Sequence, residues 1–208
     1  MQHHEPDPFG TLSQQILTRR SIRNFRAEQV PLALVDELLR LAGRAPSAHN
    51  RQPWRWVVVH TDEGKQRLAE EMGHEFHLDL RRDGVPEEKA AAMVARSHER
   101  IRGAAVVLIP CLTMSEMDCY SDGERQRCEW QMAVQSVALA CGTLMLAAHA
   151  RGLGSCWVCA PIFCVSTVQR SLALPTDWEP QGLITLGWPA DEGRNREKKA
   201  IENLTLYR

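Results

Sequence analysis

The residues with the clearest chemical capacity lie near the N-terminus, in the run Thr18-Arg19-Arg20-Ser21-Ile22-Arg23-Asn24-Phe25. Three guanidinium groups within five residues repel one another, so the run favours binding of an anion. Arginine also presents a rigid, planar set of donors that matches phosphate. The run therefore indicates a phosphate site, and the alternative is a solvated basic face that follows an amphipathic helix.

A second segment, Arg44-Ala45-Pro46-Ser47-Ala48-His49-Asn50-Arg51-Gln52-Pro53-Trp54, offers hydrogen-bonding side chains to a polar ligand. Its two prolines predict a loop with a non-helical backbone. Asn50 can both donate and accept hydrogen bonds. The ordinary pKa of His49 makes it a candidate proton donor, and the alternative is a solvated loop histidine because the sequence names no partner that would orient it.

A third segment, Gly152 to Ala160, has two glycines that would let the backbone approach a flat ligand closely. Within it, Cys156 and Cys159 have the spacing of a redox pair or of half a zinc site. A zinc site needs a second pair, and the sequence has no other Cys-x-x-Cys. In an extended segment the two thiols would also point to opposite faces, so we predict no metal site here.

Hydrophobic periodicity and the positions of proline and glycine predict the elements that hold these segments. The expected helices are 12–17, 31–42, 63–72, 86–101, 124–150 and 161–172, and the expected strands are 56–60, 104–112, 182–188 and 201–207. No structure is assigned to 74–82. The helix at 124–150 is apolar on so many sides that it should be central and buried by more than one neighbour. Helices and strands without regular alternation indicate an α+β domain.

Composition limits the classes of function. The 208 residues suit one domain, predicted as 1–208 with a loose N-terminal extension at 1–10. Lys plus Arg at 25 nearly balances Asp plus Glu at 26, which argues against a nucleic-acid or membrane partner. The sequence lacks a secretion signal, and its seven scattered cysteines do not form a disulfide framework. We therefore expect a cytoplasmic protein.

The first two segments together resemble the nitroreductase family of FMN enzymes, whose signature is Arg-Arg-Ser-x-Arg-x-Phe followed by Ala-Pro-Ser-x-x-Asn-x-Gln-Pro-Trp. The resemblance covers nearly the whole chain. It implies a central mixed or antiparallel sheet flanked by helices, and an interlocked homodimer with each FMN between two chains. Segments 96–110, 151–157 and 174–181 most resemble the C-terminal reductase domain of the bifunctional enzyme that builds coenzyme F-420.

The family pattern also implies which residues bind FMN. The arginine run would bind the phosphate and place one cation near the pyrimidine edge of the ring, the loop and the Gly152 segment would contact the ring, and a basic C-terminal tail would return to the phosphate. It further implies that 19–23 and 155–160 serve one site from different subunits. The implied cofactor ligands are Arg19, Arg20, Ser21, Arg23, Ser47, Asn50, Ser155, Val158, Cys159, Ala160, Arg196 and Lys198.

The resemblance implies a ping-pong oxidoreductase, in which NAD(P)H reduces FMN and an electron-poor acceptor is then reduced. Reduction of an F-420 precursor is the leading special case. Where well-known nitroreductases have Pro-Ile-Glu-Gly-Phe, this chain has Cys159-Ala160-Pro161-Ile162-Phe163, so nitroaromatics need not be its native acceptors. The competing hypotheses are a flavin carrier without turnover and a thiol- or metal-dependent protein. Segment 81–93 is the predicted lid over the acceptor.

Overall fold

The computed structural model describes residues 7–208. Its elements, in chain order, are the α-helices α1 (Pro8–Thr18), α2 (Leu32–Ala42), α3 (Asp62–Arg82), α4 (Glu87–Arg102), α5 (Gly123–Ala150) and α6 (Val165–Ser171), the short 3₁₀ helices η1 (Ala48–Asn50), η2 (Ala160–Phe163) and η3 (Ile201–Asn203), and the strands β1 (Trp54–Val59), β2 (Val106–Leu112), β3 (Gly154–Val158), β4 (Glu179–Pro180) and β5 (Leu183–Gly187).

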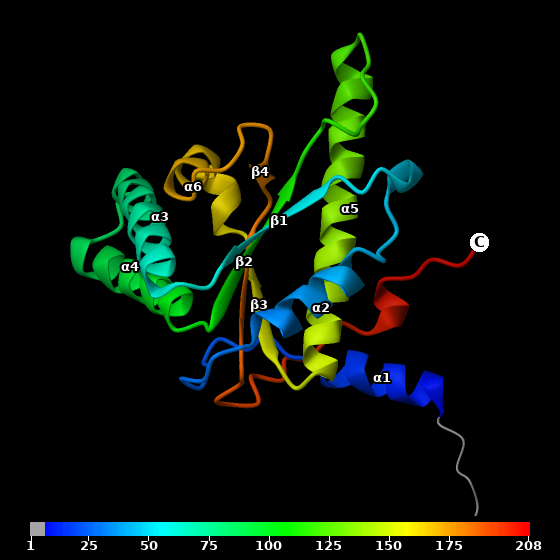
Figure 1. Ribbon diagram of the computed structural model, residues 1–208, viewed down its shortest axis with the longest axis horizontal. Helices are drawn as coiled ribbons and strands as arrows, with labels where there is room; N and C mark the ends of the chain where they lie inside the picture. The colour runs from blue at the N-terminus through cyan, green and yellow to red at the C-terminus, as the bar shows by residue number, and fades with distance from the viewer. Residues whose placement is uncertain (1–6) are drawn as a thin grey trace, which may run out of the picture.

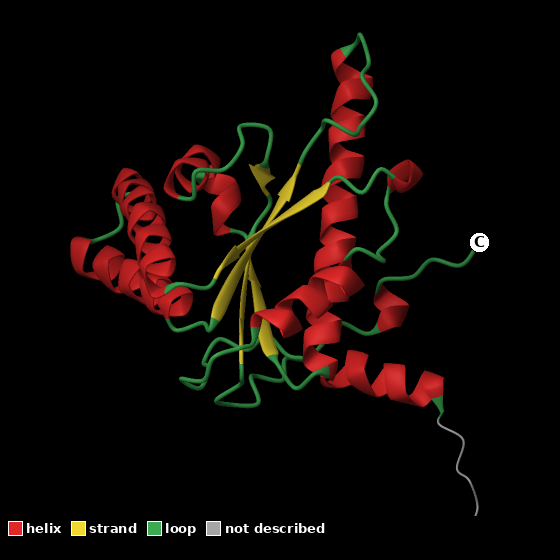
Figure 2. Cartoon of the chain, viewed as in Figure 1, coloured by secondary structure: helices red, strands yellow, loops and turns green. Residues whose placement is uncertain are grey.

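The strands form one antiparallel sheet in the order β1-β2-β5-β3, with β4 paired to the end of β2. The register places Trp54 opposite Leu112 and Ser155 opposite Leu186. Helices cover both faces of this sheet, with α3, α4 and α6 on one side and α2 and α5 on the other (Figure 1, Figure 2). The α+β class and the predicted sheet flanked by helices are confirmed.

Strand β2 is buried on both faces, and this explains why it is continuously apolar. Val106, Leu108 and Leu112 pack into the hydrophobic cluster beneath α2 and α5. Val107, Ile109 and Cys111 pack into the cluster beneath α3 and α6. Because side chains alternate along a strand, one apolar run supplies both cores.

Helix α5 is the central helix that the sequence predicts. It contacts α1, α2, β1, β2 and β3. Asp122 caps its N-terminus by accepting a hydrogen bond from Arg125 N–H, as a short acidic side chain does at this position. Its length and hydropathy would also suffice for a membrane span, but here it is a core helix packed against the sheet.

Four sequence predictions differ from the structure. Helix α1 begins at Pro8, four residues before the predicted start, because proline suits the first helical turn. Segment 74–82 continues α3 without a break. The helix predicted from Pro161 is divided into η2 and α6 at Cys164. The late strand predicted at 201–207 is wrong, since 201–203 is a 3₁₀ helix and no strand follows it within the described chain.

Candidate functional site

The arginine run lies beside β3 of the same chain. Ser21 forms a parallel bridge with Ser155, and Ile22 N–H donates to Ser155 O at 3.0 Å. Phe25 forms a second bridge, with Pro189 after β5. The structure therefore brings the run and β3 together within one subunit, which corrects the expectation that the two come from different subunits.

Two glycines make this close approach possible. A Cβ atom at Gly154 would lie 2.7 Å from Ile22 Cβ, and one at Gly187 would lie 2.9 Å from the Phe25 ring. Both glycines are buried, so a methyl group at either position has no open space to enter. The glycine that the sequence assigned to ligand contact at position 154 instead contacts the arginine run.

The substitution Gly154→Ala is expected to lower the free energy of unfolding by about 1–3 kcal/mol, because it overpacks a buried contact. It should also reduce the amount of flavin that copurifies, since Ile22 and the neighbouring arginines must move. Denaturant unfolding and the absorbance of the purified protein measure the two effects. Gly123→Ala is the matched control, because a Cβ atom there meets nothing within 4 Å.

The cationic end of the site is a cavity of about 520 Å³ between the arginine run, the end of α5 and the segment after β5. Arg20 lines this cavity and is held by hydrogen bonds from Nη1 to Leu17 O at 2.5 Å and Arg19 O at 3.0 Å. Within residues 7–208, neither Arg20 nor its neighbour Arg19 has a carboxylate partner. Their charge remains available to an anion.

The same cavity contains residues that sequence reasoning missed. His149 at the end of α5 hydrogen-bonds to Thr18 Oγ1 at 2.8 Å. Gly193 and Asn195, in the segment after β5, line another wall of the cavity. Asp191 also lines the cavity, but its carboxylate accepts hydrogen bonds from Asn24 Nδ2 at 2.7 Å and Gly193 N–H at 2.8 Å. No local pattern could have identified His149, because only the tertiary fold brings it to the arginines.

The predicted tail residues Arg196 and Lys198 are exposed and follow directly after this wall. The chain reaches the arginine run at Gly193, where a Cβ atom would lie 3.0 Å from Arg20 Cβ. Residue 196 is therefore within a few residues of the cationic cavity. A contact of either side chain with a phosphate stays a prediction.

Burial, together with the charges of Arg19 and Arg20, lowers the pKa of His149 below its ordinary value of 6.5. At a pH below 6.5, the unfolded chain therefore binds more protons at His149 than the folded chain does. The contribution of His149 to the stability of the flavin-free protein is therefore lost as the pH falls through about 6.5.

A phosphate bound at Arg19 and Arg20 would offset their charge, so we expect FMN to raise the pKa of His149. An NMR titration of His149 with and without FMN measures this shift. An unchanged pKa would mean that the phosphate binds elsewhere.

The loop with Ser47 and Asn50 lies away from the arginine run, alongside the middle of α5 (Figure 1). Ala48 N–H donates to Ser136 Oγ of α5 at 3.2 Å, and Ser47 Oγ accepts from Gln52 N–H at 3.1 Å. Thus Ser47 stabilises the turn, while the Asn50 side chain is exposed. Within one chain, this loop and the arginine run do not meet.

The loop backbone is strained. His49, Asn50 and Gln52 have φ values of 48°, 55° and 51°, in the left-handed region that non-glycine residues rarely adopt. Arg51, between them, pairs with Asp118, and this contact helps to hold the loop. Such strain is typical of a ligand-binding segment. His49 is exposed, and its role as a proton donor stays a prediction.

Val158, Cys159 and Ala160 lie at the opposite end of β3 from Ser155, where the strand ends and η2 begins. Cys159 is exposed and its Sγ accepts from Trp157 Nε1 at 3.1 Å, whereas Cys156 is buried. All seven cysteines are free thiols in the described chain. Residues 7–208 contain no cluster of three His, Cys, Asp or Glu side chains suited to a metal.

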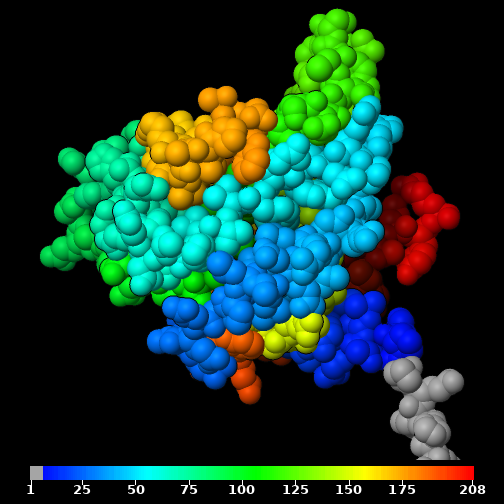
Figure 3. Space-filling view, in the orientation of Figure 1, coloured from blue at the N-terminus to red at the C-terminus, as the bar shows by residue number. Residues whose placement is uncertain are grey.

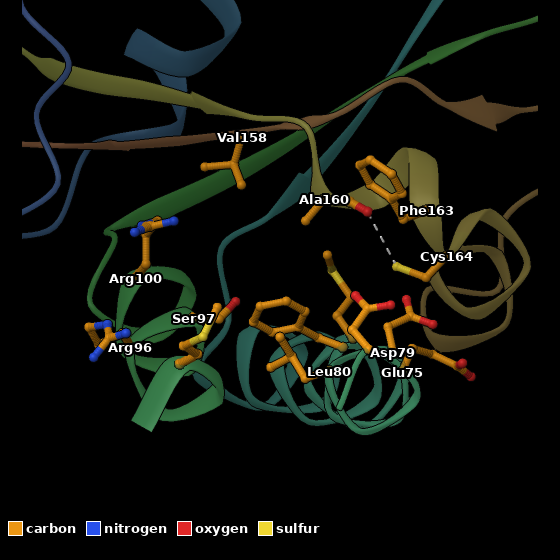
Figure 4. A pocket seen from close by; sticks show the side chains of 14 residues that line it. Glu75, Asp79, Leu80, Arg96, Ser97, Arg100, Val158, Ala160, Phe163 and Cys164 are labelled. Carbon is orange, nitrogen blue, oxygen red and sulfur yellow. Dashed lines mark hydrogen bonds between the residues drawn. The ribbon is translucent and has the colours of Figure 1, made fainter. Parts of the chain in front are cut away.

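A second cavity of about 580 Å³ lies between this end of β3 and the α3–α4 hairpin (Figure 4). Val158, Ala160 and Phe163 approach it from the strand side. The predicted lid, 81–93, is the end of α3, a turn and the start of α4, and only Asp83 and Met93 of it line the cavity. The middle of both helices forms most of that wall.

Comparison with known proteins identifies the family of the chain. Residues 16–188 match the model of the nitroreductase family. An NADH dehydrogenase of Thermus thermophilus is 31% identical over 92% of this chain and 93% of its own length. A 5,6-dimethylbenzimidazole synthase of Rhodospirillum rubrum is 33% identical over 84% of this chain and 80% of its own.

Solved structures share the fold. A nitroreductase-like protein of Desulfovibrio desulfuricans, determined in complex with FMN, superposes with a TM-score of 0.73 at 24% identity and covers 98% of both chains. A BluB-like flavoprotein of Clostridium difficile gives a TM-score of 0.76 at 21% identity, over 94% of this chain and 98% of its own. The match to the family model and the curated relatives above 30% identity show that the chain belongs to the nitroreductase family.

Proposed function

We propose that this protein is an NAD(P)H oxidoreductase that works through FMN by a ping-pong mechanism. The observation that carries the proposal is the pairing of Ser21 with Ser155, which aligns the free cations of the arginine run with one end of β3. The other end, at Val158 to Ala160, borders a large cavity. A phosphate site and a ligand-sized space are thus joined by one short strand.

The residues present fit FMN. From Ser155 to Val158 the extended chain of β3 covers about 10 Å before it turns into η2, which suits an elongated cofactor with a phosphate at one end and a flat ring at the other. Arg19, Arg20 and Arg23 would bind the phosphate, and the main chain at 158–160 would contact the ring. When bound, FMN supplies the group that accepts and donates hydride. The protein holds it, excludes water and stabilises the negative charge of the reduced ring.

A second copy of the chain would complete this site. The loop of η1 packs against the middle of α5 at Ser136, away from the arginine run at the end of that helix, and Asn50 is exposed, so it would reach a ring at β3 from another subunit. Helix α1 has no buried residue, and Phe9 and Leu17 are 80% and 71% exposed. The C-terminal tail and the tip of α5 project from the body of the molecule (Figure 3). Such uncovered apolar surface favours an interlocked homodimer.

The names of two relatives support a nicotinamide donor. One is an NADH dehydrogenase, and another, from Methanothermobacter thermautotrophicus, carries the name NADH dehydrogenase/NAD(P)H nitroreductase. The acceptor is an electron-poor small molecule, and an F-420 precursor remains the special case to test. We place the reaction in the cytoplasm, where nicotinamide donors are available.

Anaerobic absorbance spectroscopy of the purified protein tests the proposal. NADH, NADPH and reduced F-420 are added in separate cuvettes, and we expect a yellow protein that one nicotinamide bleaches rapidly. A yellow protein that no donor bleaches would indicate a flavin carrier. A colourless protein unable to take up FMN would overturn the proposal. Cys159→Ala should leave flavin content and turnover unchanged, and loss of either would favour the thiol hypothesis.

A further inference from the structure

The cavity beneath the α3–α4 hairpin has an apolar lining and two charged ends. Its apolar surface comes from Met72, Phe76, Leu80, Met93, Val158 and Phe163. At about 580 Å³ it falls in the range of small-molecule sites. Its lining includes two residues of the strand end that we assign to the flavin ring, Val158 and Ala160.

Opposite charges line different sides of this cavity. Glu75 and Asp79, one helical turn apart, lie on α3, and Arg96 and Arg100, also one turn apart, lie on α4. Figure 4 shows the two arginines on one side and the two carboxylates on the other. The cavity is therefore polarised along its length.

The carboxylates already have donors. Glu75 Oε1 accepts from Thr167 Oγ1 at 3.1 Å, and Asp79 Oδ1 accepts from Arg82 Nη1 at 2.9 Å. Burial and these two carboxylates raise the pKa of Cys164 to about 11, so its thiol stays protonated and adds no charge.

The side chains of the two arginines, unlike the carboxylates, have no hydrogen-bonding partner in the described chain. Among residues 7–208, neither Arg96 nor Arg100 forms an ion pair or a side-chain hydrogen bond. Arg100 is half-buried at the cavity wall. A guanidinium in such a position lacks an acceptor that a ligand anion can supply.

We propose that this cavity is the acceptor site, and that it selects planar aromatic acceptors with one carboxylate, which Arg96 and Arg100 bind. The apolar body of the acceptor lies between the hairpin and Val158, and its uncharged end points toward Glu75 and Asp79. A second anionic group at that end would be repelled by both carboxylates. This inference rests on the proposed function, because it uses the assignment of 158–160 to the flavin ring.

Equilibrium binding to the oxidised protein as purified tests the site without turnover. We expect isothermal titration calorimetry to give 4-nitrobenzoate about tenfold tighter binding than the neutral 4-nitrobenzamide, as charge-assisted hydrogen bonds at a half-exposed site allow. Arg96→Gln combined with Arg100→Gln should abolish this preference. The matched control, Arg81→Gln with Arg102→Gln, removes the same charge from the same hairpin outside the cavity and should keep it.

Steady-state kinetics provide a second test of the site. The Arg96→Gln/Arg100→Gln variant should have a KM for 4-nitrobenzoate about tenfold higher, with little change in kcat, flavin content or the KM for NAD(P)H.

Equal binding of the two nitro compounds by the unchanged protein would overturn the inference, as would a preference that survives in the variant. A rise confined to the KM for NAD(P)H would also overturn it, because the anion bound would then be a donor phosphate. Failure of the proposed function appears separately, as a flavin that no nicotinamide bleaches.

Discussion

Replacing Arg19 and Arg23 by alanine is expected to yield a folded protein that purifies without FMN. Both guanidiniums are free of carboxylate partners within residues 7–208 and flank Ser21, the residue that bridges to β3. Each cation that contacts a phosphate contributes about 1–3 kcal/mol to binding. Loss of two should weaken FMN binding at least about thirtyfold. Fluorescence titration of the flavin-free protein with FMN gives the Kd directly.

Arg26→Ala is the matched control for this experiment. Arg26 belongs to the same basic stretch but lies over the Trp188 ring at 5.8 Å and pairs with Glu28 at 3.4 Å. The Arg26→Ala variant should retain FMN. If the double variant kept full flavin occupancy, the arginine run would not be the phosphate site, and the assignment of that end of β3 would be wrong.

Replacing Leu139 by arginine is expected to convert the proposed homodimer into monomers that lose FMN. Leu139 is 50% exposed on α5, beside the exposed residues Ala138 and Gly142, on a helix that is otherwise central to the fold. A second chain covering this surface would bury the new charge without a partner, at a cost of about 3–5 kcal/mol. The dimer dissociation constant should then rise by two orders of magnitude or more, by the same estimate. Light scattering after gel filtration measures the mass.

Leu78→Arg introduces the same change at a 39% exposed leucine of α3, away from the proposed interface, and should leave the dimer intact. Flavin content distinguishes two explanations of any result. A monomer that still binds FMN tightly would show that Asn50 of a second subunit is not needed. A Leu139→Arg protein that remains dimeric would show that the interface lies elsewhere.

Several features were predictable because their causes are local in sequence. The apolar run of β2 and the many-sided apolar pattern of α5 predict central elements, since only a buried strand and a core helix can be apolar on every side. Gly43 ends α2, and the proline-bracketed residues 46–53 form the expected loop except for the one-turn 3₁₀ helix η1 within it. The family motifs lie on these same segments, so the fold class and the membership in the nitroreductase family were within reach of the sequence.

Other features depend on contacts between distant segments. Periodicity could not distinguish a strand from an irregular tail at 201–207, because a strand also needs a neighbour to pair with and none is present in the described part of the chain. The extension of α3 through 74–82 was missed because this stretch is polar on most sides. Packing against α4 at Gly73, which leaves room for His98, stabilises it.

By itself, the sequence determined the family, the fold class and the candidate ligands of FMN, because these follow from residue types in an ordered motif. Only the tertiary structure decided which of those segments meet. It placed the arginine run beside Ser155 in one chain, left the Asn50 loop on the other side of α5, and brought His149 to the cations. The opposed charges of the hairpin cavity arose in the same way, since two helices of unremarkable sequence become a polarised wall only when they pack antiparallel beneath β3.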